Sequence, residues 1–182
     1  KHREPLHSPR PDLIAQYPTY KDKENHYRAL IRYESRQNEK VWAKEFPMQL
    51  LTGRYVEHLG TGAESRSSLY LSELSPEPLL DIHPDKGFEL GLRSGDMVWI
   101  YGTTGLRIKV KCKFSTRVAY DTASMPYTFS GIYQGESILG RYPKGLEPYA
   151  VGEGSNIIIS YGFDIVTTTP ETKCTLCRIE KA

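Results

Sequence analysis

Apolar and basic residues alternate along positions 106–114, and this is the clearest pattern in the chain. Every second residue from Leu106 to Phe114 is apolar, and the residues between them are arginine or lysine. Successive side chains of a β-strand point to opposite faces, so this period predicts a strand with one face in the core and one in solvent.

Short apolar or β-branched runs separated by glycine and proline continue after Pro47, and runs of this kind are typical of strands. They are MQLLTGRYVEH (48–58), LLDIH (79–83), DMVWIYG (96–102), SNIIISYG (155–162) and CTLCRIE (174–180). Between the second and third runs, Pro84, Asp85 and Gly91 stand where the first helical position, the first turn and the end of one short helix would place them. The pattern predicts a mainly β fold with short helices, in which strand–helix–strand steps suit a compact barrel.

The first part of the chain has a different texture. Residues 1–20 carry four prolines among charged residues, which favours an extended linker. Residues 21–46 space apolar side chains among charges, which predicts one amphipathic helix or two short ones on the outside of the protein. Pro47 is the expected boundary, because the residue before a proline is disfavoured in a helix. We therefore divide the chain into an extension (1–46) and a main domain (47–182).

Residues 126–154 hold six glycines, four tyrosines and three prolines without apolar periodicity. This composition predicts a long ordered loop. Loops of this length are uncommon in compact domains unless they have a function, so the segment is a functional candidate.

Length and charge limit the alternatives. A chain of 182 residues with 38% hydrophobic content can form one well-packed domain with an extension. The formal charge of +2, from 24 basic and 22 acidic residues, is too balanced to indicate a nucleic-acid or membrane surface. The chain begins at Lys1 rather than Met, so we expect a processed or truncated product.

Two stretches, TGRYVEHLGTGAESR (52–66) and NIIISYGFDIVTTTPETKCTLCRIE (156–180), together resemble the molybdopterin dinucleotide-binding domain of formate dehydrogenase alpha subunits. The resemblance covers about residues 47–182 in order. It includes GLRSGDMVWI (91–100), the loop MPYTFSGIYQGE (125–136) and the ending ETKCTLCRI (171–179). It implies a six-stranded double-psi β-barrel that grips the pterin and guanine dinucleotide parts of the cofactor.

The first stretch has the chemistry that a pyrophosphate-linked cofactor needs: close backbone approach, hydroxyls and fixed cations or donors. Its candidates are Thr52, Gly53, Arg54, His58, Gly60, Thr61, Gly62, Ser65 and Arg66. On the residues alone, a glycine-rich hairpin with a solvated arginine is the better-supported alternative.

The resemblance assigns Arg54, His58, Thr61, Gly62, Ser65 and Arg66 to the cofactor-facing loop, and it adds Asn156 and Lys173 near the end of the chain. Gln134 matches the loop that closes over the pterin. The chain departs from many relatives at Gly60, where they have histidine, and at Tyr127-Thr128, where they have Phe-His.

The implied function is that of the C-terminal domain of a molybdenum or tungsten formate dehydrogenase large subunit. It would bind the bis-molybdopterin guanine dinucleotide cofactor that oxidises formate to carbon dioxide. No residue of this chain is assigned as catalytic or as a metal ligand, because the catalytic ligand and the iron–sulfur clusters belong to upstream domains. We expect the isolated domain to be inactive. The alternatives are the same domain of a nitrate or polysulfide reductase type, which the ETKCTLCRI ending disfavours, and a free-standing β-barrel binding module.

The resemblance also implies partners and a location. The partners are the upstream domains of the same subunit, an iron–sulfur beta subunit and a membrane cytochrome. The location is the periplasm, at the membrane through these partners, with the cytoplasm as the alternative.

Two other signals are weaker. Cys174 and Cys177 have CxxC spacing, but a zinc site needs four ligands and a second pair is missing, so structural packing is favoured over a redox pair. The basic residues 107–113 lack an interleaved aromatic platform in the sequence, so we expect a solvated strand face and no nucleic acid.

Overall fold

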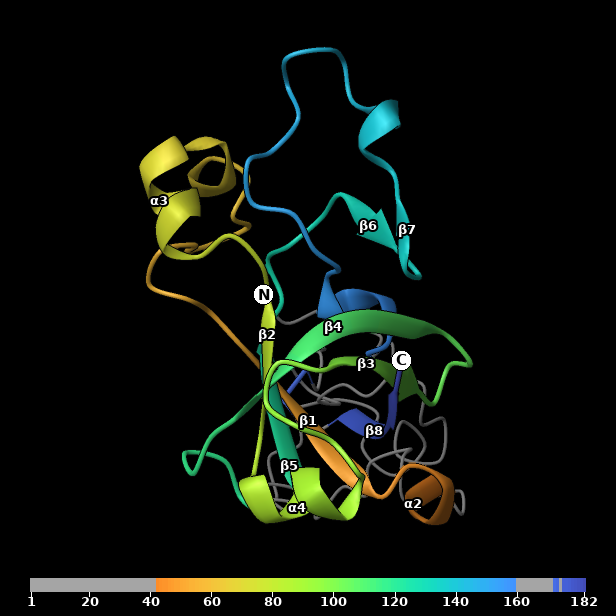
Figure 1. Cartoon of the computed structure of the whole chain (residues 1–182). Helices are drawn as coiled ribbons and strands as arrows, with labels where there is room; N and C mark the ends of the chain where they lie inside the picture. The colour runs from red at the N-terminus through yellow and green to blue at the C-terminus, as the bar shows by residue number, and fades with distance from the viewer. Residues whose placement is uncertain (1–41, 160–171, 174) are drawn as a thin grey trace, which may run out of the picture.

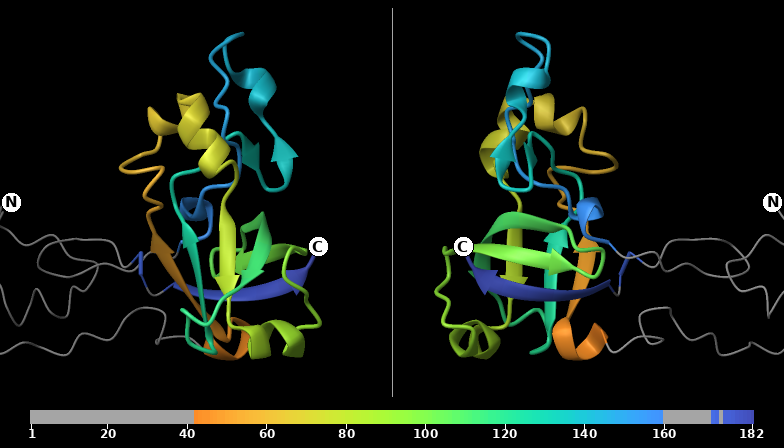
Figure 2. Two further views of the ribbon diagram at one scale, coloured as in Figure 1. Left: turned by 60° about the vertical axis from the view of Figure 1, so that its left-hand side comes forward. Right: turned by 90° about the vertical axis from the view of Figure 1, so that its right-hand side faces the viewer.

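The computed structural model describes residues 42–159, 172–173 and 175–182. Six strands in this part form a closed barrel in the order β1-β5-β2-β4-β3-β8 (Figures 1 and 2), which confirms the expected fold. The barrel strands are β1 (Met48–Gly53), β2 (Leu79–Ile82), β3 (Met97–Gly102), β4 (Arg107–Phe114), β5 (Thr122–Pro126) and β8 (Thr175–Lys181).

Short elements connect or flank these strands. The helices are α2 (Trp42–Glu45), α3 (Leu69–Leu74) and α4 (Pro84–Glu89), and the 3-10 turns are η1 (Ser65–Ser67), η2 (Leu139–Arg141) and η3 (Ser155–Ile157). A hairpin of β6 (Ile132–Tyr133) and β7 (Glu136–Ser137) forms a separate two-stranded sheet. The helix expected after Pro84 is confirmed as α4. Nearly all of the 1–46 extension lies outside the described residues.

The alternating strand behaves as its sequence predicts. Ile108, Val110 and Cys112 of β4 are buried in the barrel core, while the basic residues between them are exposed or half-buried. The core continues through Leu50, Leu80 and other apolar residues of the neighbouring strands. Burial of this apolar face is the main favourable contribution to closing the barrel.

The expected strand at 155–162 is wrong over the residues that the structure describes. Ser155–Ile157 instead forms a 3-10 turn, and Ile158 is fully buried in the core. A Cβ added at Gly102 would lie 2.3 Å from the Ile158 carbonyl oxygen, so the missing side chain allows this turn to dock on β3. Tertiary packing has overridden the β propensity of the isoleucine run.

The basic face also differs from the sequence-based interpretation. Trp99 and Tyr101 of β3 are the cross-strand partners of Lys109 and Arg107 of β4. The Arg107 guanidinium carbon lies 3.9 Å from the centroid of the Trp99 ring. Aromatic residues do accompany the basic stripe, but they come from a neighbouring strand, and cations already cover them.

The pairing of β1 with β5 places the two long loops together. The strands are parallel, and Gly53 at the end of β1 is opposite Pro126 at the end of β5. The segments after them, 54–68 and 127–154, therefore leave the same end of the barrel. Figure 1 shows α3 and the β6–β7 hairpin at this end and α4 at the other.

The buried cysteines predict a chemical test. Burial raises the pKa of the Cys177 thiol to about 12, and burial also raises the pKa of Cys112. Because the thiolate is the reactive form, neither residue should be alkylated by iodoacetamide at pH 8 in the folded protein. Both should react in urea, as tandem mass spectrometry would show. Native-state labelling of Cys177 would mean that β8 is not buried as described.

Candidate functional site

The loop after β1 is organised around His58, whose side chain is fully buried. Its Nε2 lies 2.7 Å from the Ser75 carbonyl oxygen, which can only accept, so Nε2 carries a proton. In the neutral ring, Nδ1 then accepts from the Ser65 hydroxyl, 3.1 Å away. The ring also meets Phe129 edge to face, with centroids 5.3 Å apart. His58 and Ser65 thus hold the loop from inside.

Gly62 allows the loop to press against the second long segment. Its φ is +70°, and an added Cβ would lie 2.8 Å from the Thr128 carbonyl oxygen and 3.2 Å from Arg66 Nε. Gly60 also has a positive φ, of +62°, but an added Cβ would meet nothing within 4 Å. The close approach therefore depends on Gly62, as expected for a glycine whose backbone must come near another group.

Arg66 is the buried cation of this end of the barrel. Its side chain belongs to a residue that is only 8% exposed, and Nη1 donates to Ser130 Oγ at 2.6 Å. Nε has no hydrogen-bond partner, and no carboxylate in the described part of the chain forms a salt bridge with the guanidinium. Desolvation lowers the pKa of Arg66, but an arginine stays charged in a protein.

The environment of Arg66 offers further donors. Ser130 Oγ lies 3.1 Å from the Tyr142 hydroxyl, and the buried Thr128 hydroxyl has no partner within the described residues. A buried charge without an opposite charge is costly. An anionic ligand reaching this group would lower that cost.

A second group of candidates surrounds the end of β1. Thr52 Oγ1 donates to the Thr172 carbonyl oxygen at 2.7 Å, and Lys173 Nζ donates to the Thr52 carbonyl oxygen. Arg54 is exposed beside the Tyr127 ring, 5.6 Å from its centroid. The fold thus brings residues that are far apart in sequence to one place, with two cations beside Thr52 and Gly53.

Two predicted contacts lie elsewhere on the same segments. Gln134 is in the turn of the β6–β7 hairpin with a φ of 49°, and Asn156 is exposed in η3. Among the described residues, no hydrogen bond joins either side chain to the 52–66 loop. Their assignment to the site therefore still depends on the resemblance.

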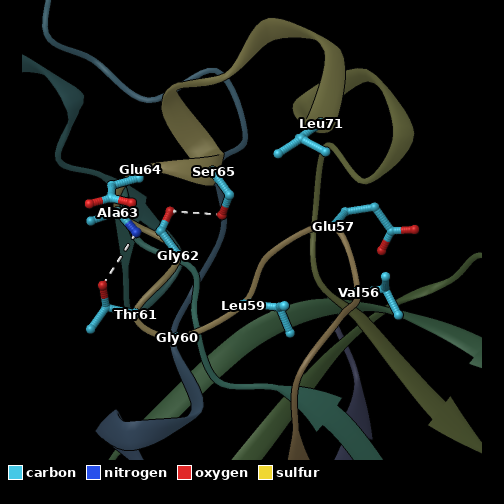
Figure 3. A pocket seen from close by; sticks show the side chains of 10 residues that line it. All are labelled: Val56, Glu57, Leu59, Gly60, Thr61, Gly62, Ala63, Glu64, Ser65 and Leu71. Atoms are coloured by element: carbon cyan, nitrogen blue, oxygen red, sulfur yellow. Dashed lines mark hydrogen bonds between the residues drawn. The ribbon is translucent and has the colours of Figure 1, made fainter.

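The outer side of the loop has different chemistry. An open pocket of about 420 Å³ there is lined by Val56, Glu57, Leu59, Gly60, Thr61, Gly62, Ala63, Glu64, Ser65 and Leu71 (Figure 3). Thr61 contributes to its wall, where its hydroxyl lies 3.5 Å from the Ala63 amide nitrogen. The lining has two carboxylates and no cation, so it does not suit a phosphate. The side with Arg66 does.

Sequence reasoning missed several residues of this region. Ser130, Tyr142 and Glu153 lie in the long loop, and only the structure shows that they are half-buried or buried near its functional candidates. The sequence marks Thr128 as a departure from relatives and assigns it no role. The one signal for Glu153 in the sequence is its position between two glycines.

Within the described ranges, no cluster of three His, Cys, Asp or Glu could hold a metal ion. None of the helices in this part of the chain has the length and apolar character of a membrane span.

Comparisons with known proteins find relatives of this chain in sequence and in fold. The F420-dependent formate dehydrogenase subunit alpha of Methanocaldococcus jannaschii is 25% identical over 138 residues, which cover 76% of this chain. The probable oxidoreductase YjgC of Bacillus subtilis is 32% identical over 92 residues, or 50% of the chain. Acetylene hydratase from Pelobacter acetylenicus has the same fold, with a TM-score of 0.56 and 20% identity over 78% of the chain.

The matched regions span 17%, 9% and 19% of these three proteins, so the chain covers less than a fifth of each. The family model described as "Molydopterin dinucleotide binding domain" matches residues 48–176. This match includes strands β1 to β5 and the start of β8, the loop around His58 and Arg66, and the long segment after β5. The chain therefore belongs to the molybdopterin dinucleotide-binding domain family of molybdopterin oxidoreductases.

Proposed function

We propose that this chain is the C-terminal domain of a formate dehydrogenase large subunit, and that it holds a guanine dinucleotide of the bis-molybdopterin cofactor. The observation that carries the binding proposal is the buried Arg66 guanidinium, which has an unpartnered Nε. The relative named as an F420-dependent formate dehydrogenase subunit alpha, 25% identical, supports the choice of enzyme. The ETKCTLCRI ending supports it further.

The residues present fit a pyrophosphate. Arginine binds phosphate oxygens through charge-assisted, often bidentate hydrogen bonds. Arg66 would hold the charge at the buried end of the site, and the Thr128 hydroxyl beside it is free to donate. Arg54 and Lys173 would complete the positive environment at the end of β1.

The cofactor, when bound, supplies the two-electron redox chemistry, and this chain's residues bind and orient it. We propose molybdenum or tungsten as its metal, and we place the iron–sulfur clusters and the catalytic ligand in other parts of the complete protein. The domain alone would then be inactive towards formate.

A second candidate is the same domain in another molybdopterin oxidoreductase. The match to the probable oxidoreductase YjgC, at 32% identity over half of the chain, favours keeping it. Given the family match, no observation supports a free-standing module for an unrelated ligand.

For partners, we propose the upstream domains of the same subunit, an iron–sulfur beta subunit and a membrane cytochrome subunit. We propose a periplasmic location at the membrane, with the cytoplasm as the alternative. The resemblance alone supports these proposals.

Replacement of Arg66 tests the binding proposal. Arg66→Gln removes the buried charge, and a charge-assisted hydrogen bond contributes about 1.5–3 kcal/mol, so cofactor affinity should fall about 10- to 100-fold. Arg54→Ala at the exposed position should lower it less, by about 2- to 5-fold. The measurement is the amount of pterin and guanine nucleotide released per mole of the complete protein, together with formate-dependent dye reduction.

Arg93→Ala is the matched control, because Arg93 is an exposed arginine in the segment between α4 and β3, and α4 lies at the other end of the barrel (Figure 1). It should leave cofactor content and turnover unchanged. Full cofactor content in folded Arg66→Gln would contradict the binding site. A complete protein that contains no pterin would contradict the cofactor assignment, and pterin without formate turnover would favour the second candidate.

A pair of glycine replacements tests the packing of the site. Gly60→Ala and Gly62→Ala both place a side chain at positive φ, which costs about 1–2 kcal/mol. Only Gly62→Ala also drives a Cβ against Thr128 and Arg66. We expect it to lower both the melting temperature and the cofactor content more than Gly60→Ala does. Equal effects would mean that the close contact at Gly62 is unimportant.

A further inference from the structure

Glu153 is a fully buried carboxylate in the long loop. Its Oε1 accepts hydrogen bonds from the Lys109 backbone N–H at 3.0 Å and from the Gly135 N–H. Its Oε2 accepts from the Gln134 N–H at 2.8 Å. No salt bridge joins Glu153 to a cation in the described residues, so backbone dipoles stabilise its charge.

The position of this carboxylate is fixed by its two glycine neighbours. A Cβ at Gly152 would lie 2.2 Å from Pro78 Cδ, and a Cβ at Gly154 would lie 2.9 Å from the Phe129 carbonyl oxygen. The Gly152 N–H also donates to the Ser130 carbonyl oxygen at 3.0 Å. The backbone around Glu153 is therefore packed against other segments and is a firm base for the side chain.

The two hairpin donors belong to the turn between β6 and β7. Gln134 and Gly135 have φ values of 49° and 85°, as a two-residue type I′ turn requires. An added Cβ at Gly135 would lie 2.6 Å from Cη2 of Trp99, so the turn rests directly on that indole. A two-stranded hairpin is marginally stable alone. Its position over the barrel therefore depends on such anchors.

We infer that Glu153 is a positioning residue, which ties the turn of the β6–β7 hairpin to strand β4 and so holds Gln134 in place to close over the cofactor. The carboxylate joins both N–H groups of the turn to the Lys109 N–H of the barrel. This inference depends on the proposed function in one respect, that Gln134 contacts the cofactor. The link between Glu153 and the hairpin stands independently of it.

The test compares Glu153→Gln with Glu136→Gln in the complete, cofactor-containing protein. The glutamine amide has nearly the same size but only one acceptor oxygen, so at least one N–H must face an NH₂ group. Glu136 is exposed in β7, and its replacement makes the same chemical change in the same hairpin. Hydrogen exchange resolved to single residues should be about 10-fold faster or more at Gln134 or Gly135 in Glu153→Gln. In Glu136→Gln it should be unchanged.

Cofactor release gives the second measurement. Glu153→Gln should speed release as much as Gln134→Ala does, and the double variant should release no faster than either. Unchanged exchange at both turn amides in Glu153→Gln would overturn the inference. The inference would also be overturned if Glu153→Gln showed faster amide exchange at the turn but released the cofactor at the normal rate, while Gln134→Ala released it faster. If Gln134→Ala releases normally as well, the error lies in the assigned role of Gln134, and Arg66 is unaffected.

A measurement on the unmodified protein covers the case in which Glu153→Gln does not fold. The amides of Gln134 and Gly135 should then exchange about 10-fold more slowly than that of Gly145, whose N–H donates to the exposed Glu147. If the amides of Gln134 and Gly135 exchanged as fast as the Gly145 amide, the positioning role of Glu153 would be overturned.

Discussion

The constraint on which this end of the molecule depends is the cost of burying a charge without an opposite charge. Arg66 and Glu153 are both buried, and neither forms a salt bridge within the described residues. The carboxylate oxygens of Glu153 accept hydrogen bonds from three backbone N–H groups. Arg66 has one hydroxyl acceptor and an unpartnered Nε. Both oxygens of the Glu153 carboxylate therefore already accept hydrogen bonds within the protein, whereas the Arg66 guanidinium still has an N–H that can donate to an anion.

The barrel makes this arrangement possible through the direction of its strands. Because β1 and β5 are parallel, the loops that follow them rise from the same end and pack on each other. Gly62 contacts Thr128, and the Tyr149 N–H donates to the Arg66 carbonyl oxygen at 2.9 Å. Binding residues commonly lie on loops that a rigid scaffold positions. Here the rigid part is the apolar core, and the loops carry the polar groups.

The sequence predicts five of the six barrel strands and α4 well, because alternation and helix-start signals are local. Local patterns do not reveal β5, whose residues are mostly buried without alternation, nor the turn at 155–157, where packing against Gly102 decides the conformation. In the site, composition and resemblance single out Arg66 and Gly62 as candidates. They do not show that His58 points inward or that Glu153 is buried, because both facts depend on contacts between distant segments.

The binding role of Arg66 is tested most directly by an experimental structure of the cofactor-loaded complete protein, in which the distance from Arg66 to the nearest pyrophosphate oxygen is measured. We expect a hydrogen bond of about 3.2 Å or less from the guanidinium to that oxygen. A pyrophosphate bound in the acidic pocket beside Glu57 and Glu64, or at the α4 end, with Arg66 still donating only to Ser130, would contradict it.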